Sequence, residues 1–189
     1  MARSIVAISG SPRRNGNTMT LLGWFLDGVR SEQCDAEVIL AAFLELKSNG
    51  CTSCRSCQKL SEYECVIDDG MRPVLQRIAQ ADVIVMATPL YFFSMSAQIK
   101  AVLDRMFSLY KWDNAAGTMR TVLTGKKLIL LASAYEGAGL EALEAPFKLT
   151  AEYSGMDFES LIVPGAGVSG EIRHVPGLSE KAFMLGKRA

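Results

Sequence analysis

The stretch Arg3-Ser-Ile-Val-Ala-Ile-Ser-Gly-Ser-Pro-Arg-Arg-Asn-Gly-Asn-Thr18 decides how the chain begins to fold. Its apolar run, 5–8, predicts a short buried strand, and the residues after it carry hydroxyl, amide and guanidinium groups between glycines. Apolar residues then recur at helical spacing, which predicts a helix over 17–31. A strand, a polar loop and a helix N-terminus can surround a phosphate with backbone N–H groups. The opening of the chain therefore predicts a phosphorylated ligand.

Short apolar segments alternate with amphipathic segments along the rest of the chain. We expect strands at 3–9, 36–43, 82–87, 127–133 and 157–163, and helices at 17–31, 70–80, 94–107, 138–154 and 179–187. Right-handed crossovers between such elements give an α/β fold, a doubly wound parallel sheet with helices on both faces. In such sheets the ligand binds at the carboxyl ends of the strands, beside the switch in strand order. We expect the site to follow the first, third and fourth strands.

Three residue-level expectations concern the helices. The apolar positions of 94–107 leave Lys100 and Arg105 for solvent. Pro146 should kink the helix at 138–154 or split it in two. Asp68 and Asp69 precede the helix at 70–80 and can cap it.

Length and charge limit the class of protein. The 189 residues are expected to form one domain, 1–189. Lysine plus arginine and aspartate plus glutamate number 20 each, without a basic tract, so we expect no nucleic-acid partner. The sequence has neither a secretory leader pattern nor an apolar run near 18 residues. We therefore expect a cytoplasmic protein without a membrane partner.

Two features of the C-terminal half are weaker signals. Gly165-Ala-Gly167-Val-Ser-Gly170 has the spacing of a dinucleotide fingerprint, but it follows the last strand and leaves no room for the βαβ unit that the fingerprint needs. We interpret it as a glycine-rich exit loop. His174 is the only histidine, and we interpret it as a loop residue without a catalytic role.

Two motifs together resemble a known family. Gly10-Ser11-Pro12-Arg13 followed by Asn17-Thr18 is similar to the phosphate loop of the flavodoxin-like NAD(P)H-dependent FMN reductases. Pro89-Leu90-Tyr91 after the third strand resembles the Pro-x-Tyr turn of the same family. The resemblance covers the whole chain. It implies a flavodoxin-like sheet of five parallel strands in the order 2-1-3-4-5 and FMN as cofactor.

The resemblance also implies a set of cofactor-binding residues. The first loop would bind the FMN phosphate, the second would line the isoalloxazine ring, and the third, after 127–133, would complete the site. These residues are Ser9, Ser11, Arg13, Asn15, Gly16, Asn17, Thr18, Pro89, Leu90, Tyr91, Phe92, Phe93, Ser133, Tyr135, Glu136 and Gly137. The three aromatic side chains at 91–93 can supply a flat apolar wall for the ring.

The implied activity is the transfer of electrons from NADH or NADPH, through FMN, to a small-molecule or redox-protein acceptor. The chemistry belongs to the cofactor, so no catalytic side chain is predicted. The resemblance implies a homodimer or homotetramer. The alternative is a non-enzymatic FMN electron carrier reduced by a partner protein; such carriers are strongly acidic, whereas this chain is neutral. A nucleotide-binding protein without redox chemistry would leave the cysteines and aromatic residues unexplained.

Four of the five cysteines, Cys51, Cys54, Cys57 and Cys65, form a Cys-x2-Cys-x2-Cys-x7-Cys array. Four thiolates at this spacing can surround one iron–sulfur cluster, whereas zinc sites usually have two Cys-x-x-Cys pairs. The array resembles that of the iron–sulfur flavoproteins, which implies a [4Fe–4S] cluster. Free thiols are the alternative, because related reductases carry cysteines in this loop without a cluster, and Val66 stands where ferredoxins have proline.

Overall fold

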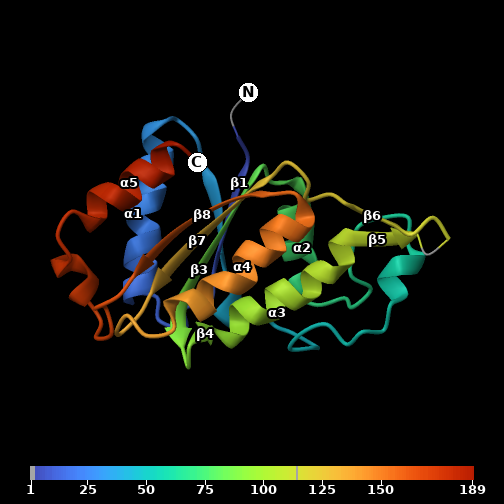
Figure 1. The fold of residues 1–189 in the computed structure, drawn as a ribbon, viewed down its shortest axis with the longest axis horizontal. Helices are drawn as coiled ribbons and strands as arrows, with labels where there is room; N and C mark the ends of the chain where they lie inside the picture. The colour runs from blue at the N-terminus through green and yellow to red at the C-terminus, as the bar shows by residue number, and fades with distance from the viewer. Residues whose placement is uncertain (1–2, 114) are drawn as a thin grey trace.

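The computed structural model describes residues 3–113 and 115–189 (Figure 1). The strands are β1 (Ile5–Ser9), β2 (Ala36–Leu40), β3 (Val83–Tyr91), β4 (Ser94–Met95), β5 (Tyr110–Asp113), β6 (Thr118–Thr121), β7 (Lys127–Ser133) and β8 (Asp157–Val163). The α-helices are α1 (Asn17–Ser31), α2 (Met71–Gln80), α3 (Ala97–Arg105), α4 (Leu140–Ser154) and α5 (Leu178–Lys187). Every strand and helix expected from the sequence is present.

The main sheet has the order β2-β1-β3-β7-β8, and all four pairings along this path are parallel. Ile5 of β1 lies between Ala36 of β2 and Val83 of β3. The predicted fold class and the strand order 2-1-3-4-5 are therefore confirmed. The strand order switches between β1 and β3, which places the favoured ligand position at their carboxyl ends.

Helices cover both faces of the sheet. Figure 1 shows α1 and α5 on one face and α2, α3 and α4 on the other. Successive residues of β1 alternate between the two cores: Val6 and Ile8 pack under α2, α3 and α4, whereas Ile5 and Ala7 pack under α1 and α5. Because both faces are covered, the central strands are apolar throughout, which is why the sequence revealed them.

Glycines let α1 and α5 approach closely. A Cβ at Gly28 of α1 would lie 2.0 Å from the backbone oxygen of Phe183 on α5. A Cβ at Gly186 of α5 would lie 1.9 Å from the backbone oxygen of Phe25 on α1. Any larger residue at either position would push the two helices apart.

The expectation that Pro146 splits the fourth helix is wrong. Helix α4 runs unbroken from Leu140 to Ser154 with Pro146 inside it. Leu143 and Phe147 are both fully buried, so packing on each side of the proline anchors the helix to the sheet. Tertiary packing here outweighs the loss of one helical hydrogen bond.

Short strands in the middle of the chain were not predicted. Strand β4 pairs antiparallel with the end of β3, so α3 begins at Ala97 rather than at residue 94. Ser96 caps α3 by accepting a hydrogen bond from the backbone N–H of Ile99. A separate antiparallel hairpin of β5 and β6 follows α3 and extends beyond the main sheet (Figure 1).

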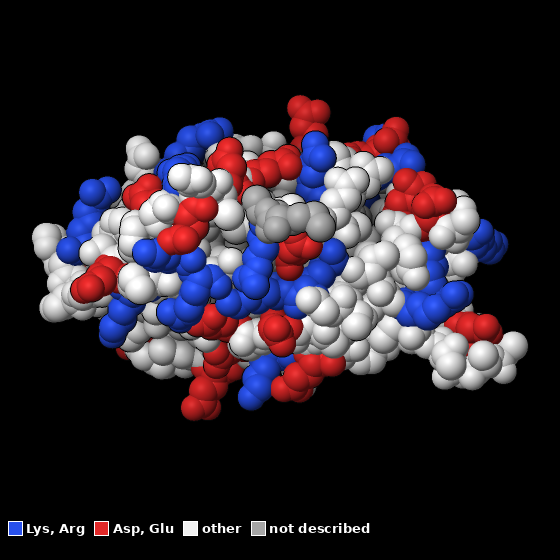
Figure 2. All heavy atoms as spheres, turned by 90° about the horizontal axis from the view of Figure 1, so that it is seen from above, with Lys and Arg blue, Asp and Glu red and all other residues white. Residues whose placement is uncertain are grey.

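None of the helices in the described part of the chain has the length and apolar character that a membrane span requires. Figure 2 shows basic and acidic side chains intermixed over one face of the molecule. The expected lack of a nucleic-acid partner stays a prediction.

Candidate functional site

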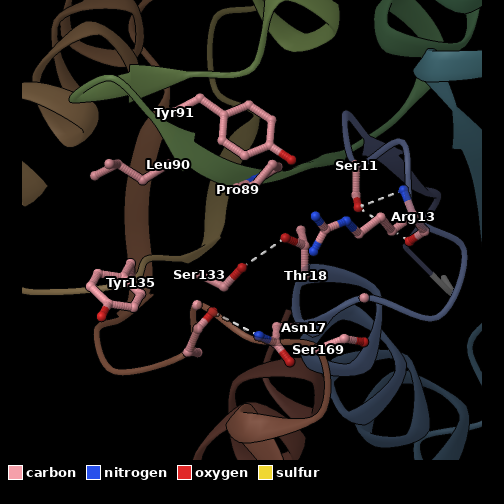
Figure 3. A pocket seen from close by; sticks show the side chains of 13 residues that line it. Ser11, Arg13, Asn17, Thr18, Pro89, Leu90, Tyr91, Ser133, Tyr135 and Ser169 are labelled. Atoms are coloured by element: carbon pink, nitrogen blue, oxygen red, sulfur yellow. Dashed lines mark hydrogen bonds between the residues drawn. The ribbon is translucent and has the colours of Figure 1, made fainter.

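A cavity of about 240 Å³ lies at the carboxyl ends of β1, β3 and β7 (Figure 3). Its position is the one that the strand order favours. The residues that line it are Ser11, Arg13, Gly16, Asn17, Thr18, Pro89, Leu90, Tyr91, Ser133, Tyr135, Ala166, Gly167 and Ser169.

The loop between β1 and α1 is held in a tight turn by its own polar groups. Ser11 Oγ accepts a hydrogen bond from the backbone N–H of Arg13 and donates one to the Arg13 carbonyl, both at 3.2 Å. Gly16 donates its N–H to the same carbonyl at 3.2 Å. Gly10 lies so close to α3 that a Cβ there would be 2.3 Å from Ser96 Oγ. These hydrogen bonds and the close approach of Gly10 to α3 fix the loop backbone beside the cavity.

The N-terminus of α1 is open to an anion. Its N-cap residue, Gly16, has no side chain that could accept a hydrogen bond from the first N–H groups of the helix. The first turn of α1 also contains no acidic residue. The first N–H groups of a helix have no partner inside the helix, and they carry its partial positive charge. Arg13 has no ion-pair partner among the residues that the structure describes, and its guanidinium extends toward Thr18 in Figure 3. This end of the cavity has the donors that a phosphate needs.

Two side chains of the first turn of α1 connect it to distant loops. Thr18 Oγ1 and Ser133 Oγ share a hydrogen bond of 2.8 Å, which joins α1 to the end of β7. Asn17 Nδ2 donates to the backbone oxygens of Ala166 and Val168 at 2.6 and 2.8 Å, and its Oδ1 accepts from the N–H of Gly170. The Asn17 side chain is therefore occupied in holding the loop after β8, and its backbone N–H is what it offers to the cavity.

The other end of the cavity is more apolar. Pro89, Leu90 and Tyr91 line it from the end of β3, and Tyr135 lines it from the loop after β7 (Figure 3). A Cβ at Gly167 would lie 2.1 Å from the Tyr135 ring, so the loop after β8 passes directly against that side chain. Pockets with apolar walls and a few polar groups are typical of cofactor sites.

Several predicted cofactor-binding residues lie outside the lining of this cavity: Ser9, Asn15, Phe92, Phe93, Glu136 and Gly137. Ser9 is buried beneath it, where its Oγ accepts the N–H of Ser11. Phe92 and Phe93 have positive φ angles of 47° and 62°, and the Phe92 side chain is 98% exposed. Of the three aromatic residues expected to form a wall, the structure brings only Tyr91 to the cavity.

Sequence reasoning missed the contribution of the loop after β8. Ala166, Gly167 and Ser169 line the cavity, although we interpreted this glycine-rich segment as an exit loop. The signal that could have found them is the strand order, since a loop that follows the strand next to β7 emerges at the same edge of the sheet.

The four clustered cysteines line a second, smaller cavity of about 20 Å³. Cys57 and Cys65 are buried in its wall, whereas Cys51 and Cys54 are exposed. Hydrogen bonds from Ser56 lower the pKa of the Cys54 thiol, and burial raises the pKa of the Cys57 thiol. The fold therefore gathers all four predicted sulfur ligands around one space.

The β5–β6 hairpin holds this cysteine loop in place. The Gln58 side chain donates to the Tyr110 carbonyl at 2.9 Å and accepts from the Trp112 N–H at 3.2 Å, as a neighbouring strand would. Lys111 Nζ donates to the carbonyls of Cys57 and Leu60 at 2.6 and 3.1 Å. These contacts fix the backbone on both sides of Cys57.

Four cysteine sulfurs are the metal-binding groups at this second cavity. In residues 3–113 and 115–189, no group of three or more histidine, cysteine, aspartate or glutamate side chains is placed to hold a single metal ion. A [4Fe–4S] cluster is larger and spreads its four cysteine sulfurs around a cube. Four cysteines around one cavity match the donor set of such a cluster better than that of a zinc ion.

The expectation that Arg105 faces solvent is wrong. Its side chain is fully buried and forms an ion pair with the buried carboxylate of Asp69, with an N···O distance of 2.8 Å. Burial alone would raise the pKa of Asp69, but the hydrogen bonds from Arg105 and from two backbone N–H groups hold it below its usual range. Asp69 also accepts the N–H of Met71 at the start of α2, so it fills the predicted capping role, while Asp68 lies in solvent.

The family model described as NADPH-dependent FMN reductase matches residues 3–166. The chain belongs to this family. The family membership that the two sequence motifs predicted is thereby confirmed.

Individual relatives agree with this assignment. An iron–sulfur flavoprotein of Methanocaldococcus jannaschii is 38% identical over 101 residues, which are 53% of this chain and 50% of that protein. The chain thus spans about half the length of the curated relatives it matches.

Solved structures are similar over the whole chain. An FMN-dependent NADH-azoreductase of Bacillus anthracis, solved with FMN, has a TM-score of 0.73 at 14% identity, and the match covers 100% of this chain and 99% of the azoreductase chain. An NAD(P)H:quinone oxidoreductase of Methanothermobacter marburgensis has a TM-score of 0.70 at 18% identity, covering 100% and 98%. These two structures show the shared fold.

Proposed function

We propose that this FMN reductase family member is an oxidoreductase that binds FMN in the larger cavity and takes electrons from NADH or NADPH. The observation that carries the proposal is the arrangement of that cavity, with an uncapped helix N-terminus and Arg13 at one end and Pro89, Leu90 and Tyr91 at the other. When bound, FMN would supply the redox chemistry between the pyridine nucleotide and the acceptor.

The chain's own residues would bind and orient the cofactor. Arg13, Ser11 and the first N–H groups of α1 would hold the phosphate, because they are the donors at that end of the cavity. Tyr91 and Tyr135 would flank the ring system. Thr18 and Ser133, bonded to each other, would keep the two sides of the cavity at a fixed distance. None of these groups needs to exchange a proton.

We further propose that Cys51, Cys54, Cys57 and Cys65 hold a [4Fe–4S] cluster. Their location around one cavity and the similarity to iron–sulfur flavoproteins support this proposal. Such a cluster would pass electrons singly, which suits a redox-protein acceptor as well as a small molecule. The exposed segment with Ser53 and Arg55, both at φ 55°, is the part of the loop that would adjust around it.

Anaerobic mixing with a pyridine nucleotide tests the reductase proposal. The FMN-loaded protein should lose its flavin absorption when NADH or NADPH is added, and a turnover assay should identify the preferred nucleotide. Absence of bleaching with both nucleotides, together with reduction by a partner protein, would show an electron carrier instead.

An iron and sulfide assay tests the cluster proposal. Wild-type protein prepared without oxygen should contain about four iron and four sulfide ions per chain, which is the content of one [4Fe–4S] cluster. Cys54→Ser should lose most of this iron. Cys34→Ser is the matched control, because Cys34 lies outside the loop, and it should keep the wild-type content. Iron-free wild-type protein with four alkylatable loop thiols would establish the free-thiol alternative.

We also propose that the protein forms a homodimer or homotetramer. Phe92, almost fully exposed, and Phe93, which is 56% exposed, stand next to the larger cavity and support an interface there. Light scattering on the FMN-loaded protein should give a mass of two or four chains. A single-chain mass at micromolar concentration would contradict the proposal.

We place the protein in the cytoplasm. None of the five cysteines forms a disulfide within the described chain, which suits a reducing compartment. Fractionation of the native host and immunodetection of the protein test this, and its recovery outside the cytoplasm would contradict it.

A further inference from the structure

One buried side-chain nitrogen of the described chain lacks a hydrogen-bond partner, and it belongs to Arg105. Its Nη1 donates to Asp69 Oδ2 at 2.8 Å and its Nη2 donates to the Ile67 carbonyl at 3.2 Å. The remaining donor, Nε, is buried and unpaired within residues 3–113 and 115–189. Buried polar groups in proteins are almost always paired, so an unpaired one calls for a missing acceptor.

The surroundings of Arg105 indicate where that acceptor lies. Arg105 lines the cavity of the four cysteines, and its guanidinium lies beside the Cys65 thiol. Asp69 does not line this cavity. The Arg105 guanidinium therefore lies at the cavity of the four cysteines, and the Asp69 carboxylate lies farther from it.

The acceptor must also be chemically suited to a buried guanidinium. The Arg105 side chain is 0% exposed and the Asp69 side chain is 1% exposed, so the pair is shielded from solvent. An N–H in such a low-dielectric environment interacts strongly with a negatively charged acceptor. A sulfur that carries negative charge when it binds iron is such an acceptor, and the Cys65 sulfur interacts with the Arg105 guanidinium.

We propose that Arg105 is a positioning residue for the cysteine-bound group: its Nε–H donates a hydrogen bond to the Cys65 sulfur and favours the reduced, more negatively charged state of that group. The inference rests on the proposed [4Fe–4S] cluster. Hydrogen bonds to ligand sulfurs and nearby charges are among the factors that set cluster potentials. Because reduction adds negative charge, a donor at the sulfur raises the midpoint potential. Asp69 holds the guanidinium in the orientation that this requires.

The midpoint potential of the cluster is the quantity to measure. We would combine Arg105→Met with Asp69→Asn, so that neither buried charge is left without its partner. A dye-mediated anaerobic titration followed by electron paramagnetic resonance should give a more negative potential than in the wild type. The FMN content should stay the same, because neither residue lines the larger cavity.

The matched control removes a second ion pair of the same loop. Arg72 and Glu64 pair at 2.8 Å, but their side chains are 35% and 21% exposed. Arg72→Met with Glu64→Gln removes the same kind of charges beside Cys65, where solvent screens them. This variant should keep the wild-type potential.

Each outcome separates the two proposals. Iron-free wild-type protein overturns the cluster proposal and this inference with it. An iron-loaded wild type whose potential is unchanged by the Arg105→Met and Asp69→Asn pair overturns this inference alone. If that double variant does not fold or retain iron, Arg105→Lys decides, because lysine keeps a charge beside Asp69 but has no Nε–H. A potential equal to that of the wild type in Arg105→Lys would overturn the inference, and a more negative one would support it.

Discussion

Asn17 donates a hydrogen bond of 2.6 Å from its side-chain Nδ2 to the backbone carbonyl of Ala166, 149 residues further along the chain. With the bonds to Val168 and Gly170, this one amide group connects the first turn of α1 to the loop after β8. Both segments line the larger cavity, so the cavity depends on a single asparagine for part of its shape.

Replacing Asn17 with aspartate should open this connection. Asn17→Asp exchanges the Nδ2 donor for an oxygen that faces two carbonyl oxygens. The Ala166 carbonyl loses its side-chain donor, whereas the Val168 carbonyl keeps the N–H of Glu171. We expect the free energy of unfolding to fall by about 1–3 kcal/mol, together with weaker FMN binding. Urea denaturation and FMN titration check this. Asn49→Asp, at an exposed loop position, should change neither quantity. Wild-type stability in Asn17→Asp would contradict the role of the amide.

Two neighbouring arginines should differ sharply in their effect on FMN. Arg13 lines the larger cavity, whereas Arg14 lies over the Phe43 ring at 4.2 Å and does not. Arg13→Gln would remove the charge-assisted contact proposed for the phosphate, so we expect the dissociation constant of FMN to rise about 10- to 100-fold. Arg14→Gln should leave it nearly unchanged. Fluorescence titration of the FMN-free protein measures both, and equal affinities of the two variants would disprove the phosphate assignment.

The crossing of α1 and α5 predicts opposite effects for two glycine substitutions in one helix. Gly28→Ala places a methyl group 2.0 Å from the Phe183 carbonyl oxygen, so we expect a loss of about 1–3 kcal/mol of stability as the helices separate. Gly23→Ala meets no atom within 4 Å in the described chain and should stabilise α1 by about 0.5–1 kcal/mol. Denaturation midpoints measure both. A stabilised Gly28→Ala variant would rule out the close approach.

Asp82 should contribute stability only above acidic pH. Its carboxylate accepts the backbone N–H and the hydroxyl of Ser4 at 2.8 and 2.9 Å, and these bonds lower its pKa. A lowered pKa in the folded state gives stability that is present above the unfolded value of about 3.9 and is lost as the pH falls through the folded value.

Asp82→Asn should therefore be less stable than the wild type at pH 7, by less than about 1 kcal/mol because solvent screens the site. The difference should vanish as the pH falls below about 4. Urea denaturation at several pH values measures it. Asp157→Asn, at an exposed position, serves as the control for removal of a surface carboxylate. A difference that does not depend on pH would contradict the role of the charge.

The central strands were predictable because burial on both faces leaves a purely apolar run, such as the one from Ile5 to Ile8. The strand order 2-1-3-4-5 followed from the family resemblance, whereas the phosphate loop was predicted from the strand, polar loop and helix that open the chain. Strands β5 and β6 could not be predicted, because each has only four residues and neither forms an apolar run: β5 mixes aromatic with charged side chains, and β6 mixes polar and charged side chains with a methionine. Short strands of this kind depend on tertiary contacts, here with Gln58.

Some site residues could likewise be predicted from a local motif, whereas others depend on contacts with distant parts of the chain. Arg13 and Thr18 lie in a local motif, so the sequence alone places them at the cavity. The burial of Arg105 depends on Asp69, 36 residues away, and helical spacing carries no information about such a partner. Gly167 reaches the cavity because β8 lies beside β7, which is a property of the sheet order and not of the glycine-rich segment.

Helix α3 determines how far apart the two cavities are. Its cap, Ser96, touches the phosphate loop at Gly10, and its last residue, Arg105, lies at the cysteines. Nine residues at about 1.5 Å per residue make a rod of roughly 13 Å. In the proposed reductase, electrons would pass between the FMN and the cluster, and tunnelling slows steeply with separation. Inserting or deleting a single residue in this rod would therefore change the transfer rate and turn Arg105 away from the cysteines.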